Sequence, residues 1–89
     1  MKLRYNHSII NLDNYDQVKL FKCLFKEGFV IEAVKMTAGG GLFGGTSTTS
    51  TEIAYFDKSE DARKALNAIQ EAWVKNEASF NLIEWLENN

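Results

Sequence analysis

The chain has 89 residues, of which 45% are hydrophobic and 25% charged, and its formal net charge at pH 7 is −2. This length predicts one small domain, 1–89, and the hydrophobic content excludes a disordered chain. The slightly acidic balance argues against nucleic-acid binding that depends on neutralising phosphates with a basic surface. No apolar run is long enough for a signal peptide or a membrane span, so we expect a cytoplasmic protein.

The N-terminal third predicts a strand followed by a helix. Residues 2–12 are rich in β-branched and aromatic side chains, which is typical of a strand. Over 13–28, an acidic first turn and Gly28 at a left-handed stop indicate a helix, with Phe29 contacting Leu24 after the stop. As a strand, the same segment would place Lys22 among apolar residues. The apolar residues that share one helical arc are Val18, Leu20, Phe21, Leu24 and Phe25.

Two further strands and a second helix are predicted downstream, over 29–37, 51–57 and 57–76. Asp57 and Glu60 have the spacing of a capping box, and Asn76 is a plausible left-handed stop. The face of this helix expected to be buried consists of Ala62, Ala65, Leu66, Ile69, Ala72 and Trp73.

The C-terminal tail has two interpretations. Phe80, Leu82 and Ile83 favour a fourth strand, which we prefer. Alternatively, Asn81 and Glu84 cap a short helix.

This order of elements predicts an α+β fold of the ferredoxin-like, split βαββα(β) type, with two helices on one face of an antiparallel sheet. Alternation along the strands then assigns one set of residues to the helices: Val30, Val34, Met36, Ala54 and Phe56. Ile31, Ala33, Ile53 and Tyr55 would face outward. An apolar outer face predicts a homo-oligomer, whose interface would contain these four residues and Trp85. In the alternative, the tail covers this face in a monomer.

The stretch "MTAGGGLFGGTSTTST" (36–51) separates the second and third predicted strands by a loop at about 38–50. Glycines at 39–41, 44 and 45 allow close approach to the backbone, and free N–H groups in such turns can hold anions. A slack hairpin connector is the alternative. Neither a Walker lysine nor a G-x-G-x-x-G pattern is present.

The segment "GFVIEAVKMTAGGGLFGGTSTT" resembles the signature of PII-like cyclic-di-AMP receptors. The family's loop phenylalanine and asparagine are replaced here by Gly41 and Thr46. The resemblance implies a trimer of ferredoxin-like subunits with an anionic ligand, a cyclic dinucleotide or another nucleotide, at the subunit boundary. The ligand-binding residues it implies are Thr37, Gly39, Gly40, Gly41, Leu42, Phe43, Gly44, Gly45, Thr46 and Thr48.

Three functions are considered. The first is a PII-like module that senses or sequesters such a ligand. The second is a protein-interaction or inhibitor module, of the kind phages direct against host defence, with Leu42 and Phe43 as anchors. The third, an enzyme, is not expected, because the sequence offers no catalytic residues, no metal ligands at the usual spacing and no cofactor motif.

Binding of RNA is also not expected. "EIAYFDKSEDARKALNAI" is similar to part of RNA recognition motifs. The positions that would stack on bases are Ser8, Thr51 and Ile53, and none of them is aromatic.

Overall fold

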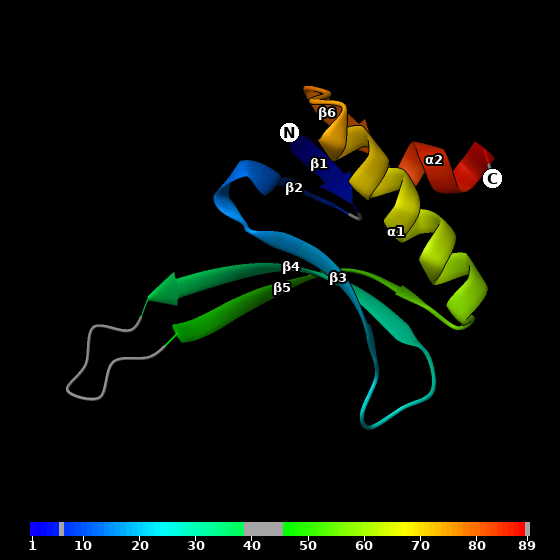
Figure 1. Ribbon diagram of the computed structural model, residues 1–89. Helices are drawn as coiled ribbons and strands as arrows, with labels where there is room; N and C mark the ends of the chain where they lie inside the picture. Colours follow the sequence, from blue (N-terminus) through cyan, green and yellow to red (C-terminus); the bar gives the residue numbers. More distant parts are fainter. Residues whose placement is uncertain (6, 39–45, 89) are drawn as a thin grey trace.

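A computed structural model describes residues 1–5, 7–38 and 46–88 of the chain. These residues form two three-stranded sheets and two α-helices (Figure 1), which confirms the α+β class. The strands are β1 (Lys2–Tyr5), β2 (Ser8–Asn11), β3 (Gln17–Lys22), β4 (Phe29–Ala38), β5 (Thr46–Phe56) and β6 (Ser79–Asn81). A 3₁₀ turn, η1 (Leu12–Asn14), precedes β3, and the helices are α1 (Ser59–Val74) and α2 (Leu82–Asn88).

The smaller sheet joins the two ends of the described chain in the strand order β2–β1–β6. The predicted single strand over 2–12 is in fact a hairpin, with β1 antiparallel to β2. β6 pairs with β1 in parallel, and Leu3 lies opposite Phe80. The predicted tail strand is therefore confirmed for Ser79–Asn81 only. The alternative is confirmed for the rest, because the Asn81 side chain accepts a hydrogen bond from the Glu84 amide at 3.1 Å and helix α2 begins at Leu82.

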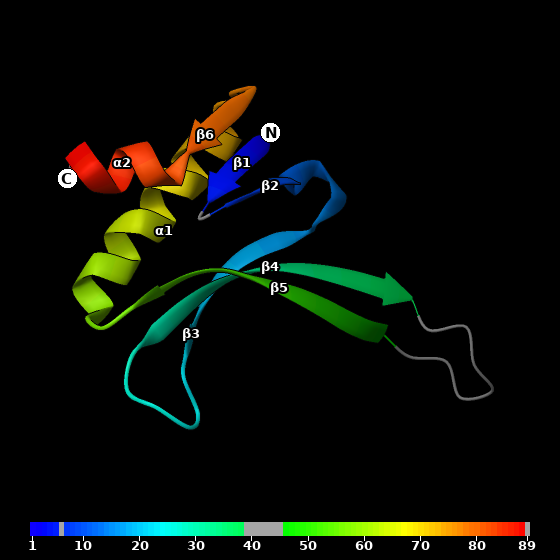
Figure 2. The ribbon, with the colours of Figure 1, turned by 180° about the vertical axis from the view of Figure 1, so that it is seen from behind.

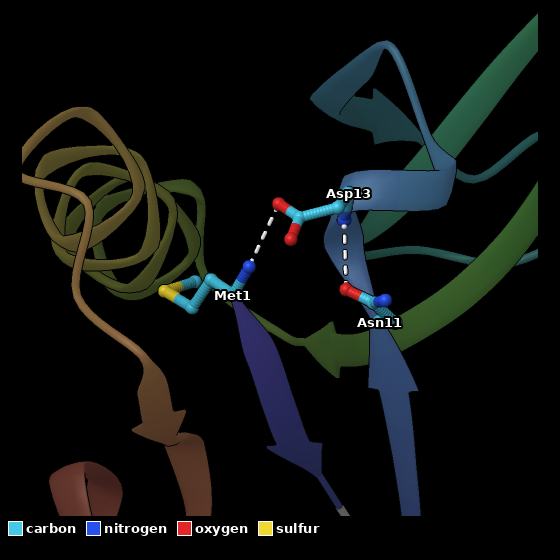
Figure 3. A network of polar contacts seen from close by, with 3 residues as sticks. All are labelled: Met1, Asn11 and Asp13. Carbon is cyan, nitrogen blue, oxygen red and sulfur yellow. Dashed lines mark hydrogen bonds and ion pairs between the residues drawn. The ribbon is translucent and has the colours of Figure 1, made fainter.

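The Met1 ammonium is held at the edge of this sheet by the Asp13 carboxylate, which accepts from it at 2.7 Å (Figure 3). The backbone N–H of Asp13 in turn donates to the Asn11 side chain at 3.1 Å, so Asn11 caps the start of η1. The hydrogen bond from the ammonium is the main reason why the pKa of Asp13 lies below its ordinary value of 3.8.

The larger sheet is an antiparallel meander in the order β3–β4–β5. The helix predicted over 13–28 is wrong, and the ferredoxin-like order is therefore not seen in the described elements. Short apolar runs fit a strand and a helix equally well, and pairing with β4 decides the outcome here. Val18 and Leu20 lie opposite Ala33 and Ile31 and share one face with them.

Helix α1 was predicted correctly and covers that face. Ala65, Ile69 and Ala72 are buried against the sheet, and the Gln70 side-chain amide donates to the Val18 carbonyl at 3.1 Å. Asn76 adopts a left-handed φ of 58°, and the Glu77 amide bonds the Ala72 carbonyl, which together end the helix as predicted. The expected Asp57 cap is wrong, because Lys58 occupies the cap position and no side chain bonds there.

For β4, the face that packs on α1 is therefore the reverse of the predicted one. Ile31 and Ala33 are completely buried under α1, because the face they share with β3 is the one the helix covers. Ile53 is also buried, since β5 has one extra residue at a bulge where Ile31 pairs with Ala54 and Glu32 with Glu52.

The residues assigned to the helices divide into three groups, because the prediction holds for β5 next to the bulge and is reversed for β4. Ala54 and Phe56 pack on the core as predicted. Val30 and Val34 are buried but lie outside the core cluster, and Met36 is 42% exposed.

Beyond β3, the strands β4 and β5 continue as a two-stranded arm, 35–38 paired with 46–49 (Figures 1 and 2). Asp16 connects the arm to the sheet: its N–H donates to the Val34 carbonyl at 2.9 Å and its carboxylate accepts from the Met36 amide at 2.6 Å. The predicted loop at about 38–50 is shorter than expected, because β5 already begins at Thr46.

Candidate interaction site

The turn between β3 and β4 projects from the larger sheet on the side away from α2 (Figures 1 and 2). It is closed by the Cys23 amide, which donates to the Gly28 carbonyl at 3.0 Å. Two apolar residues occupy its tip, where Leu24 is 90% and Phe25 100% exposed. These side chains have no contact with the core, although the sequence assigned both to the buried face of a helix.

The turn is held in place by Tyr55 of β5. Gly28 has a φ of 119°, and the Tyr55 ring packs so closely on it that a Cβ atom would overlap the ring. The Tyr55 hydroxyl donates to the Glu27 carbonyl, and the Lys26 ammonium lies 4.2 Å from the ring centroid. Loss of hydration, reinforced by the Asp57 carboxylate, raises the pKa of Tyr55.

An apolar patch extends from the tip onto the outer face of the sheet. Phe21 is 39% exposed and lies opposite Val30 in the register, and Val30 lies opposite Tyr55. A hollow of about 500 Å³ follows this surface, between the tip and the sheet. The residues that line this hollow, which we call the turn patch, are Phe21, Lys22, Cys23, Leu24, Phe25, Lys26, Val30 and Glu32.

Of the residues implied as ligand-binding, Thr37, Thr46 and Thr48 lie in the arm, at a distance from the turn patch. Thr37 and Thr48 are exposed on β4 and β5, and Thr46 is the first residue of β5. Gly39, Gly40, Gly41, Leu42, Phe43, Gly44 and Gly45 lie outside the described residues. At the root of the arm, Thr37 and Thr49 line a hollow of about 420 Å³ together with Lys35 and Tyr15.

The predicted interface is corrected by the fold. Ile31, Ala33 and Ile53 are covered by the chain's own helix and are not available to a second subunit. Tyr55 remains 38% exposed but supports the turn, and Trp85 packs on the core from α2. The apolar outer surface of this sheet consists instead of the turn patch, whose lysines on both sides of Leu24 and Phe25 were the one sequence signal for an exposed turn.

In the described part of the chain, no group of three or more His, Cys, Asp or Glu side chains could hold a metal ion. Neither described helix has the length and apolar character needed to cross a membrane. No protein-family model, curated protein or solved structure matches the chain.

Proposed function

We propose that the protein is an interaction module that docks on another protein through the turn patch. The single observation that carries this proposal is the full exposure of Phe25 beside the 90% exposed Leu24, on a turn that Tyr55 holds in one position. Isolated apolar side chains on a surface are ordinary, whereas adjacent ones that continue into a hollow are typical of a binding surface.

Docking would be driven by transfer of the Leu24 and Phe25 side chains from water into a partner's pocket. Burial of a leucine or phenylalanine side chain contributes about 1.5–3 kcal/mol, so two anchors in a partner's pocket would supply a substantial part of a moderate affinity. Because the turn is already held by Tyr55, little conformational entropy is lost when it binds. Lys22 and Lys26 are both exposed beside the tip and favour a partner whose pocket has an acidic rim.

The proposal is tested by placing a photo-crosslinking amino acid at position 25 and irradiating the protein in a lysate of its own cells. We expect a defined cross-linked product, and we expect a Leu24→Ser substitution in the labelled protein to weaken it, because one of the two anchors is then lost.

The matched control is the same amino acid at position 74, because Val74 is 82% exposed but lies at the end of α1, outside the turn patch. A cross-linking pattern that is the same from positions 25 and 74 would mean that exposure alone causes the reaction. That result contradicts the proposal.

A small anionic ligand at the arm is a second candidate function. It is favoured by the hollow at the root of the arm, where the Lys35 side chain and the hydroxyl-bearing Thr37 and Thr49 line one space. Thr37 is also one of the residues that the resemblance to PII-like receptors implies. Calorimetric titration with a panel of nucleotides tests this function, and a Lys35→Gln variant should weaken any binding observed. The absence of heat with every nucleotide would exclude it.

A further inference from the structure

A second concave surface lies between β5 and α2, and Tyr55, which packs on Gly28 of the turn, is one of its lining residues. Its volume is about 530 Å³. Ile53 and Leu82 are buried there, and the remaining large apolar and aromatic residues of the lining are Tyr5, Tyr55, Ile83 and Leu86. We call this surface the β5–α2 groove.

The groove carries two carboxylates, whereas Lys22 and Lys26 lie on the two sides of Leu24 and Phe25 at the tip of the turn. Glu52 and Glu87 line it, and both are exposed. Across the sheet, Glu52 of β5 lies opposite Glu32 of β4. Glu32 in turn lies opposite Lys19 of β3, so this lysine is next to Glu32 and not next to Glu52. Neither Glu52 nor Glu87 has an ion-pair partner in the part of the chain that the structure describes. A cation brought to this groove would relieve the repulsion between the paired carboxylates.

The backbone at the groove is also open. β5 pairs with β4 along one edge, and in the described residues no other strand pairs with its second edge. An exposed strand edge of this kind can accept further backbone hydrogen bonds from a partner. The occupant that fits is therefore short, apolar at its centre and basic on both sides.

We propose that this occupant is the Leu24–Phe25 turn of a second copy of the chain. The inference rests on the proposed function and names its partner. Leu24 and Phe25 would fill the apolar space between β5 and α2, while Lys22 and Lys26 would approach Glu52 and Glu87. The turn cannot already fill the groove of its own chain, because its two apolar side chains are 90% and 100% exposed.

This contact joins two different surfaces, so in a pair one copy retains an unused groove and the other an unused turn. Such head-to-tail interfaces continue into a closed ring when the rotation between copies allows it, and into an open chain when it does not. A trimer is one of the closed rings this geometry permits.

The test is the solution mass, measured by sedimentation over a wide range of concentration, of wild type and two defective variants. The turn variant carries Leu24→Ser and Phe25→Ser. The groove variant carries Glu52→Lys and Glu87→Lys at exposed positions, so both should keep the fold, which circular dichroism checks. We expect the wild-type mass to rise with concentration and each variant to associate at least about tenfold more weakly.

Mixing the two variants separates this contact from a turn-to-turn one. The groove variant still has an intact turn and the turn variant an intact groove, so the mixture should contain pairs and no larger species. If the groove variant alone associates as well as wild type, or if the mixture contains no pairs, the proposal is overturned.

A wild type that keeps the mass of one chain at every concentration also overturns it. If position 25 then still cross-links to a different protein, the proposed function stands and only the second copy is excluded as the partner. If the wild type has the mass of one chain and position 25 gives no specific cross-link, both the proposed function and the contact between copies are excluded.

Discussion

The larger sheet ends in two projections whose chemistry is opposite, although β4 contributes to both. The β3–β4 turn is short, is closed by the hydrogen bond from Cys23 to Gly28, and presents apolar side chains to solvent. The β4–β5 arm is a two-stranded ribbon, and its Thr37 and Thr48 present hydroxyl groups. Asp16 ties its root to the sheet.

The difference shows that projection from the fold does not by itself indicate a binding surface. Exposed hydroxyl groups are well hydrated and gain little when a protein partner covers them, whereas Phe25 gains the full free energy of leaving water. The turn is therefore the better candidate for protein docking. The arm, with Lys35 at its root, is the better candidate for a small anion.

The largest expected effect compares two residues of the same strand, one in the sheet and one in the arm. Ile31→Ala should lower the free energy of unfolding by roughly 3 kcal/mol, because a completely buried side chain leaves a cavity under α1. Met36→Ala should lower it by about 0.5 kcal/mol or less, since Met36 is 42% exposed. Urea denaturation of both variants measures the difference, and equal losses would contradict the boundary between sheet and arm.

A substitution in the turn should have the next largest effect. Gly28→Ala places a Cβ atom against the Tyr55 ring at a φ of 119°, so it should cost roughly 2 kcal/mol. The control is the same substitution in a Tyr55→Ala background, where the clash is absent and only the backbone strain remains. A cost that is the same in both backgrounds would show that Tyr55 does not hold the turn.

At the root of the arm, Asp16→Ala should cost about 1 kcal/mol through loss of the hydrogen bond from the Met36 amide. The effect should be local. Hydrogen exchange at Met36 should become faster, while the amides of β3 and β4 within the sheet should keep their protection. Uniform acceleration across the sheet would mean that the arm and the sheet open as one unit.

The smallest expected effect lies outside both projections. Asp13 has a lowered pKa in the folded state, so its pairing with the Met1 ammonium stabilises the fold above the ordinary carboxyl pKa of 3.8 and loses this effect as the pH falls through the folded value. Asp13→Asn should therefore unfold at a slightly lower temperature than wild type at pH 7. The gap should close below pH 3.8, and a gap independent of pH would exclude the ion pair as its cause.

The sequence correctly predicted the elements whose signals, such as apolar periodicity and capping residues, lie within a few residues of one another. The apolar face of α1 repeats at helical spacing over its length, and Asn76 alone is enough to indicate where the helix ends. The strand over 29–37 and the cap at Asn81 were also predictable, because β-branched composition and a side chain three residues before a helical amide are local signals.

The candidate site was not predictable in the same way. Leu24 and Phe25 fit the apolar face of a helix well, and within 13–28 only the lysines on both sides of them indicate an exposed turn. Only the pairing of Gln17–Lys22 with β4 converts the segment to a strand and a turn. The contact between Tyr55 and Gly28 joins residues 27 positions apart, beyond any local pattern.

By itself, therefore, the sequence determined the α+β class, helix α1 and the strand character of β4, because each depends on periodicity and turn chemistry within a few residues. The tertiary structure alone decided that Ile31 and Ala33 face α1, that β6 pairs with β1, and that the apolar tip of the turn is exposed. These outcomes depend on which distant surfaces meet. The free energy of such packing exceeds the small local preferences that separate a helix from a strand.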